Sequence, residues 1–81
     1  MVDRDEIRHE VVAALREMVP KGPIAEHSKL FADLKLLSDD FTWVALRLER
    51  RFGLWIPRDQ WEPMDTVGDI VNLIERHTAG G

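Results

Sequence analysis

Apolar residues recur every three or four positions through most of the chain, and this spacing is typical of amphipathic helices. Near the N-terminus, Asp3 precedes Glu6 by three residues, which fits the start of a helix with a capping box. The residues that would share the buried face of this helix are Ile7, Val11, Ala14, Leu15 and Met18. Pro20 and the pair Gly22-Pro23 predict its end.

The clearest helical pattern follows a long connection that runs from Lys21 to about Leu37. Its apolar residues fall within a narrow arc of one helix face. They are Phe41, Val44, Ala45, Leu48 and Phe52. Gly53 predicts the end of this helix. The connection itself carries four apolar side chains that we expect to hold it on the core: Leu30, Phe31, Leu34 and Leu36.

Two more helices are predicted after Gly53. The stretch "LWIPRDQWEPM" is bracketed by Pro57 and Pro63, which leaves room for only a short helix around Trp61. Thr66 and Asp69 then form a T-x-x-D cap for a last helix. Its inward residues would be Val67, Ile70, Val71 and Ile74.

This pattern predicts an all-α fold, a small four-helix bundle with three main helices, one short helix and a long first loop. We expect a single domain over residues 1–81, with a disordered tail at 78–81. No run of alternating apolar and polar residues competes with the helical pattern.

Composition narrows the classes of function. The chain has 81 residues, 44% of them apolar and 32% charged, and no cysteine, so we expect a small globular protein without disulfides or thiolate metal sites. A net charge of −4 disfavours nucleic acid as a partner. No apolar stretch approaches the ~20 residues of a membrane span, and the segment "MVDRDEIRHE" does not resemble a signal peptide. We therefore expect a cytoplasmic monomer.

Catalytic and metal chemistry find little support in the sequence. His9, His27 and His77 share no spacing typical of metal ligands, so we expect no metal site. Ser38 is followed by two aspartates, but no histidine is placed in sequence to suggest a base for a catalytic triad. We expect that the protein is not an enzyme and has no catalytic residue.

Ser38 interrupts the hydrophobic run "LKLLSDDFTW" just where the second helix is predicted to begin. Serine is a favoured N-cap residue, because its oxygen can accept a hydrogen bond from a backbone N–H of the first turn. Asp39 and Asp40 would then complement the positive end of the helix dipole. These residue types alone predict a helix cap.

Short motifs spread along nearly the whole chain suggest a second interpretation. They are "FADL" at 31–34, "LERRFG" at 48–53, "IP" at 56–57 and "TVGDIVNLIE" at 66–75. Ser38 follows Leu34 by four residues. Together these features resemble the acyl carrier protein family, whose pattern reads D-L-G-x-D-S-L-D, then L-E-x-x-F, I-P and T-V-x-D. The resemblance implies that Ser38 receives 4'-phosphopantetheine.

As a stand-alone carrier, the protein would hold an acyl group as a thioester on this arm for fatty acid or polyketide biosynthesis. Its partners would be a phosphopantetheinyl transferase and a dedicated acyl-transferring or condensing enzyme. Lys35, Leu37 and Asp39 depart from the glycine, aspartate and leucine of the family pattern. In the family, that aspartate and leucine help the transferase to position the serine. The alternative is therefore an unmodified, carrier-like interaction module.

The outward face of the second predicted helix would serve as the docking surface in either case. It carries Asp39, Trp43, Leu46, Arg47 and Arg50. In the resembling family this face is rich in glutamate, whereas here residues 39–52 hold three acidic and three basic side chains. Tryptophan, leucine and arginine are typical of binding hot spots. We expect partners with acidic or apolar docking residues, unless Trp43 packs against the long loop.

Trp55 and Trp61 follow the second predicted helix. In the family, this region and the end of the second helix line the pocket for an acyl chain. The two indoles could shape such a pocket. Filling the core is the favoured interpretation, because so small a domain needs large apolar side chains.

Overall fold

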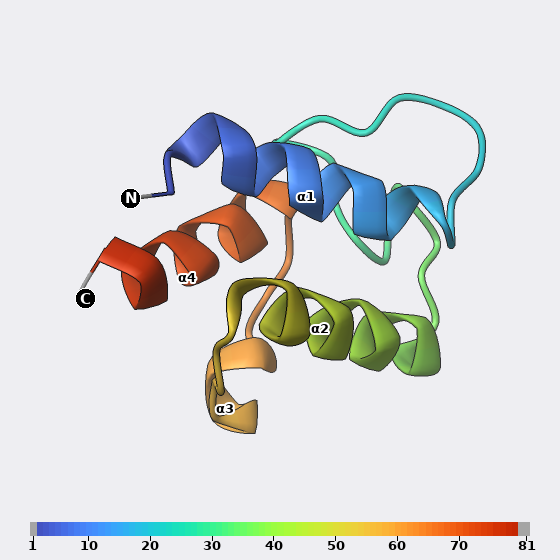
Figure 1. Ribbon diagram of the computed structural model, residues 1–81. Helices are drawn as coiled ribbons and strands as arrows, with labels where there is room; N and C mark the ends of the chain where they lie inside the picture. The colour runs from blue at the N-terminus through green and yellow to red at the C-terminus, as the bar shows by residue number, and fades with distance from the viewer. Residues whose placement is uncertain (1, 80–81) are drawn as a thin grey trace.

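The computed structural model describes residues 2–79, which form four helices and no strand (Figure 1). Helix α1 spans Arg4–Arg16, α2 spans Ser38–Phe52, α3 spans Arg58–Trp61 and α4 spans Val67–Ala79. The expected all-α bundle, with a short third helix and a long first loop, is confirmed. No helix in the described part of the chain combines the length and the apolar character that crossing a bilayer requires.

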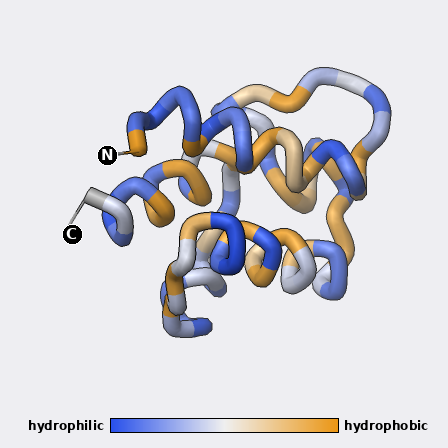
Figure 2. The backbone as a smooth tube through the Cα atoms, in the orientation of Figure 1, coloured by the Kyte–Doolittle hydropathy of each residue, from blue (hydrophilic) through white to orange (hydrophobic). Residues whose placement is uncertain are grey.

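One hydrophobic core joins the three long helices. Helix α1 packs against both α4 and α2, while α3 lies beside the C-terminal half of α2 (Figure 1). The apolar positions of α1, α2 and α4 turn towards one another (Figure 2). The largest fully buried side chains include Ile7, Leu15, Leu30, Leu48, Ile70, Leu73 and Ile74. The helical spacing seen in the sequence therefore identified the faces that build the core.

Two of the expected helix caps are confirmed. The Asp3 carboxylate accepts a hydrogen bond of 2.8 Å from the backbone N–H of Glu6 at the start of α1. At the start of α4, Thr66 and Asp69 cap each other: the Asp69 N–H donates to Thr66 Oγ1 (3.1 Å), and the Thr66 N–H donates to Asp69 Oδ2 (3.0 Å). The hydrogen bond from the Thr66 backbone, followed by that from Asp65, lowers the pKa of Asp69 below its ordinary value.

The long first loop is fastened to the segment before α4 by backbone hydrogen bonds. The N–H of Leu30 donates to the Asp65 carbonyl (2.8 Å), and the Ser28 carbonyl accepts from the Val67 N–H (3.0 Å). The Arg4 guanidinium pairs with Glu26 of the loop at 2.7 Å and with Glu75 of α4 at 3.1 Å. Hydrogen bonding to Glu26 is the main cause that raises the pKa of Arg4. The loop is thus part of the folded frame.

Two local expectations differ from the structure. Leu30, Leu34 and Leu36 are buried as expected, but the Phe31 side chain remains 43% exposed. Helix α4 continues through Thr78 and Ala79, where we expected a disordered tail. The rest of that expected tail, residues 80–81, lies outside the described residues.

Candidate functional site

Helix α2 begins at Ser38 itself, one residue earlier than expected. The N-cap residue is Leu37, whose backbone N–H donates to Asp40 Oδ2 at 3.2 Å. The expectation that the Ser38 side chain caps α2 is therefore wrong, because the Asp40 carboxylate supplies the hydrogen bond. Ser38 is exposed, and its hydroxyl forms no hydrogen bond within residues 2–79. Capping does not explain why a serine occupies this position.

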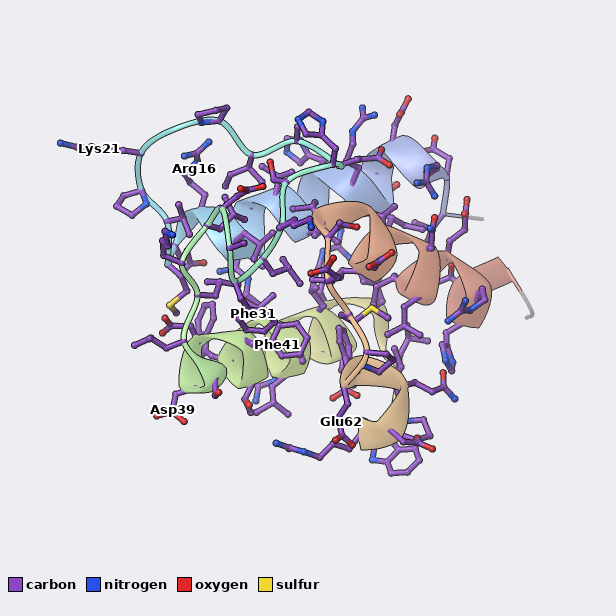
Figure 3. The ribbon with its side chains drawn as sticks, turned by 180° about the vertical axis from the view of Figure 1, so that it is seen from behind. Arg16, Lys21, Phe31, Asp39, Phe41 and Glu62 are labelled. Carbon is purple, nitrogen blue, oxygen red and sulfur yellow. The ribbon has the colours of Figure 1, made fainter. Side chains whose placement is uncertain are left out.

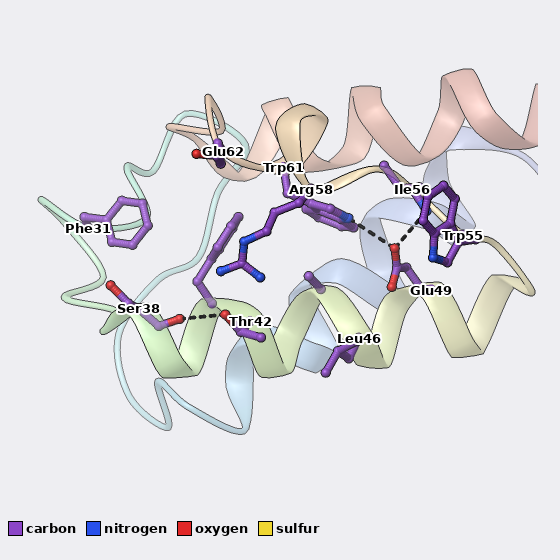
Figure 4. Close-up of a pocket in the computed structure, with 12 residues that line it drawn as sticks. Phe31, Ser38, Thr42, Leu46, Glu49, Trp55, Ile56, Arg58, Trp61 and Glu62 are labelled. Atoms are coloured by element: carbon purple, nitrogen blue, oxygen red, sulfur yellow. Dashed lines mark hydrogen bonds between the residues drawn. The ribbon is translucent and has the colours of Figure 1, made fainter.

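Ser38 lies at one end of a groove of about 370 Å³ that follows α2 towards α3 (Figure 4). Its apolar lining residues are Phe31, Phe41, Ala45, Leu46, Trp55, Ile56 and Trp61. Its polar lining residues are Ser38, Thr42, Glu49, Arg58 and Glu62. The groove therefore joins an exposed hydroxyl to a largely apolar surface that also carries charged groups.

Three aromatic rings build one wall of the groove. The ring centroids of Phe31 and Phe41 are 5.7 Å apart, and the Phe41 ring meets the Trp61 ring edge to face at 6.0 Å. Such geometries are favourable for aromatic pairs. Figure 3 shows Phe31 next to Phe41 above α2. The partial exposure of Phe31 follows from this position, since the ring belongs to the groove rather than to the core.

Glu49 fixes the other end of the groove. Its Oε2 atom accepts hydrogen bonds from the Ile56 N–H (2.8 Å) and from Trp61 Nε1 (3.3 Å), as the dashed lines of Figure 4 show. These bonds hold the segment between α2 and α3 on the end of α2. Helix α2 ends at Gly53, whose φ of 65° lies in the left-handed region that glycine adopts without strain.

The two tryptophans near α3 have different positions. Trp61 is 5% exposed and fills the core, as expected, whereas Trp55 is 80% exposed at the edge of the groove. The core-filling interpretation is wrong for Trp55, because the neighbouring Ile56 takes the buried place at 3% exposed. Pro57 favours an extended backbone at Ile56. Successive side chains of an extended backbone point to opposite sides, so Trp55 turns outward when Ile56 turns inward.

The outward face of α2 gathers four of the five expected docking residues. Trp43, Leu46, Arg47 and Arg50 line a shallow pocket of about 270 Å³. The Arg47 guanidinium lies 5.6 Å from the centre of the Trp43 ring and forms an ion pair with Glu17 at the end of α1. Trp43 remains 40% exposed and Leu46 55% exposed, so neither is withdrawn into the loop.

Asp39, the fifth expected residue, is exposed but lies outside this pocket. Its carboxylate points away from the protein at the start of α2 (Figure 3). Of the three histidines, His77 is hydrogen-bonded through Nε2 to Gln60 Oε1 at 2.7 Å. Within residues 2–79, no group of three or more histidine, aspartate or glutamate side chains is arranged to hold a metal ion.

The sequence did not single out Glu49, Arg58 or Phe31 as members of a site. Glu49 could have been suspected, because it belongs to the L-E-x-x-F motif. Arg58 carried no signal beyond its place directly after the I-P motif. Its guanidinium extends over the groove from α3 and forms no ion pair within residues 2–79.

No family model matches the chain. Comparison with curated proteins gives similar sequences that are named acyl carrier proteins. One, from a Sulfurovum species, is 37% identical over 71 residues, which cover 88% of this chain and 92% of the relative. Another, from Thermotoga maritima, is 33% identical over 78 residues, which cover 94% of this chain and 96% of the relative.

A third relative, from Lactobacillus acidophilus, is 41% identical over 59 residues, which cover 73% of this chain and 74% of the relative. The similarity thus extends over most of both chains and does not depend on a single motif. The relatives are named as carriers, and no catalytic family is indicated.

Proposed function

The chain belongs to the acyl carrier protein family, and from that premise we propose that it holds an acyl group as a thioester on a 4'-phosphopantetheine arm at Ser38. A carrier role in acyl handling follows from the family. The position of Ser38 supports the finer proposal: an exposed hydroxyl, unused by the fold, stands at the first residue of α2 and opens onto the groove.

The residues around Ser38 fit such an arm. The first N–H groups of a helix lack partners within the helix and favour a negatively charged group, and α2 is a regular helix of 15 residues. The aromatic wall of Phe31, Phe41 and Trp61 offers an apolar surface beside the hydroxyl. Asp39 opposes a phosphate by charge repulsion, although its exposure to solvent weakens this effect.

The chain itself catalyses no step in this proposal. The Ser38 hydroxyl supplies the oxygen of a phosphodiester, and the bound arm supplies a thiol on which an acyl group is held as a thioester. Helix α2 keeps the attachment point at the surface, where enzymes can reach it. The proposed partners are a phosphopantetheinyl transferase and an enzyme that transfers or condenses the acyl group.

The pocket of Trp43, Leu46, Arg47 and Arg50 is the proposed docking surface for these partners. Large exposed apolar side chains beside arginine are typical of the energetic centre of interfaces. Partners that present acidic or apolar residues fit this surface, because basic partners would meet like charges. We therefore expect poor exchange with fatty acid synthases that read an acidic helix.

Mass spectrometry tests the proposal at Ser38. The protein is produced together with the phosphopantetheinyl transferase of its own source organism, and its intact mass is measured. We expect the mass of the arm to be added once. Ser38→Ala should abolish the addition, whereas Thr42→Val, which removes the other hydroxyl of the groove, should not. An unmodified wild-type protein, or modification that survives Ser38→Ala, would contradict the proposal.

The docking surface needs a separate measurement. Trp43→Ala and Leu46→Ala should each slow modification or acyl transfer roughly tenfold while leaving the thermal midpoint nearly unchanged, since both side chains are partly exposed. Arg50→Glu should weaken transfer as well. Arg76→Glu, an exposed arginine on α4, is the matched control and should have no effect. Equal effects of the two arginine changes would exclude this surface.

The unmodified interaction module remains the second candidate. Leu37 and Asp39 favour it, because they replace the aspartate and leucine that flank the serine in the family pattern. In that case Ser38→Ala should leave function intact, and the changes on the docking surface should abolish it. A carrier protein would instead lose its function on Ser38→Ala as well as on the changes in the docking surface.

A further inference from the structure

We propose that the groove accepts an acyl group with an amino substituent next to the thioester, and that Glu49 binds the ammonium beside the exposed indole of Trp55. This inference depends on the proposed arm at Ser38 and adds the chemical class of its cargo. It rests on three observations: the distance along α2, the surroundings of Glu49 and the position of Arg58.

Ser38 and Glu49 stand on one face of α2 at a separation that suits the arm. They are eleven residues apart. At 1.5 Å and about 100° per residue, this separation corresponds to roughly 16 Å and three turns, so the two side chains point the same way. An arm of about 14 bonds between the serine oxygen and the sulfur spans about 17 Å when extended, at the ~1.2 Å per bond of an extended chain. A thioester would therefore lie beside Glu49.

Glu49 keeps an acceptor available at this place. Its Oε2 atom is used by the Ile56 N–H and by Trp61 Nε1, whereas Oε1 forms no hydrogen bond within residues 2–79. No buried side-chain oxygen in this described part lacks a partner, so Oε1 is open to solvent. An ionised carboxylate has about four acceptor positions. Glu49 can thus accept from an ammonium without releasing the backbone that it holds.

The exposed indole beside Glu49 favours the same kind of ligand. Figure 4 shows the Glu49 carboxylate between Trp61 and Trp55. Trp61 donates to this carboxylate, and Trp55 precedes Ile56, whose N–H does the same. Trp61 is buried and turns its N–H edge to the carboxylate, so the exposed Trp55 is the indole that is open to a ligand. Aromatic faces attract cations, and tryptophan does so most strongly. A carboxylate beside an exposed indole is therefore complementary to a positively charged group.

Arg58 completes a charge pattern along the groove. Its guanidinium lies between Ser38 and Glu49 in Figure 4, and it forms no ion pair within residues 2–79. It can donate to the anionic and carbonyl oxygens of the arm. An ammonium is disfavoured there and favoured at Glu49, so the pattern also sets the direction of the bound arm. A purely hydrocarbon acyl chain would cover the Arg58 guanidinium and the open Oε1 atom of Glu49 without offering a hydrogen bond to either.

The test attaches the arm chemically, so that it does not depend on a transferase. A Ser38→Cys protein is alkylated with pantetheine arms that carry either an alanyl or an isobutyryl group through a stable amide in place of the thioester. These groups differ in one ammonium against one methyl. The indole N–H resonances of Trp55 and Trp61 report the docked fraction by two-dimensional NMR. We expect the alanyl arm to dock about fivefold better.

Variants locate the effect. Trp55→Ala and Glu49→Gln should both abolish the preference for the alanyl arm. Trp55 is 80% exposed, so its removal should not disturb folding even if the change at Glu49 does. Asp59→Asn is the matched control, because Asp59 is an exposed acidic residue on α3 that does not line the groove, and its change should not affect the preference.

Equal docking of the two arms, or a preference for isobutyryl, would overturn the inference. The same holds if the preference survives both Trp55→Ala and Glu49→Gln. If transferases leave the wild-type protein unmodified, the proposed function is wrong, whatever the result with the chemically attached arms. The two failures are thus distinguishable.

Discussion

Helices α1 and α4 bury their apolar side chains, whereas the region of α2 and α3 leaves several of its own in solvent. Between α1 and α4 lie side chains without measurable exposure, such as Ile7, Leu15 and Ile70. Around α2 and α3, Leu37 is 68% exposed and Trp55 80% exposed. A small domain has few apolar side chains to stabilise it, so exposure of this extent is costly for folding and points to binding.

Individual arginines of the two regions differ in the same way. Arg4 of α1 pairs with Glu26 and Glu75 and ties the loop to α4. By contrast, Arg50 and Arg58 form no ion pair within residues 2–79. Arg4 therefore stabilises the fold, whereas Arg50 and Arg58 remain available to a ligand or a partner.

The largest expected effect contrasts a core residue with a groove residue. Ile70→Ala should lower the free energy of unfolding by about 2–5 kcal/mol, because Ile70 is fully buried and its truncation leaves a cavity. Trp55→Ala removes a larger side chain but should change stability by no more than about 0.5 kcal/mol, since it is exposed. Urea denaturation measures both. A comparable loss in both variants would refute this contrast between the core and the groove.

An intermediate effect is expected at Glu49, which lines the groove and also holds the segment between α2 and α3 in place. Glu49→Ala should lower the free energy of unfolding by about 1–3 kcal/mol, because the Ile56 N–H and Trp61 Nε1 lose their acceptor. Glu49→Gln keeps a carbonyl acceptor and should cost less. The difference between the two variants in chemical denaturation measures the hydrogen bonds. An equal loss of unfolding free energy in the two variants would show that the hydrogen-bond acceptor at residue 49 has no structural role.

The acid dependence of stability should be a property of the α4 cap. Because hydrogen bonds from Thr66 and Asp65 lower the pKa of Asp69, the folded state binds its proton less readily than the unfolded state does. The contribution of Asp69 is present above its unfolded pKa of 3.8 and is lost as the pH falls through the lower folded pKa.

Asp69→Asn should accordingly destabilise the protein by about 1 kcal/mol at neutral pH, and this deficit should shrink as both proteins are acidified below the ordinary aspartate pKa. Thermal unfolding from pH 7 to pH 2 measures it. Asp39→Asn, at an exposed aspartate beside Ser38, serves as the control and should show no such convergence. A deficit that stays constant with pH would exclude the role of the Asp69 charge.

The smallest effect is expected at Lys35, three residues before Ser38. Its φ of 60° lies in the left-handed region, where a residue with a Cβ atom is strained and where the family pattern has glycine. Lys35→Gly should raise the free energy of unfolding by up to about 1 kcal/mol, since relief of strain outweighs the added freedom of the unfolded chain. Differential scanning calorimetry resolves this change. Destabilisation would show that the Lys35 side chain has a compensating contact.

The sequence predicted what depends on short-range patterns. The spacing of apolar residues predicted the helices, and the residue types at Asp3 and Thr66 predicted two caps. The cap of α2 was misassigned, because Ser38, Asp39 and Asp40 are all suitable capping residues and only the backbone path selects Asp40. Periodicity also could not say which of two neighbours, Trp55 or Ile56, enters the core.

The groove was harder to predict, because its parts come together only in three dimensions. Phe31 belongs to the first loop, Glu49 to α2 and Arg58 to α3, and no spacing in the sequence links them. Ser38 and Glu49, at its two ends, are three helical turns apart. This spacing indicates a shared groove only when the structure shows that both side chains line one surface. The docking residues were easier to find, since they share one face of a single helix.

The chemical state of Ser38 in the cells that make the protein decides most directly whether the protein is a carrier. The protein is isolated from its source organism, and the peptide that contains residue 38 is sequenced by tandem mass spectrometry. We expect a substantial fraction of this peptide to carry the phosphopantetheine arm on Ser38. A bare Ser38 throughout growth, in cells whose other carrier proteins are modified, would contradict it.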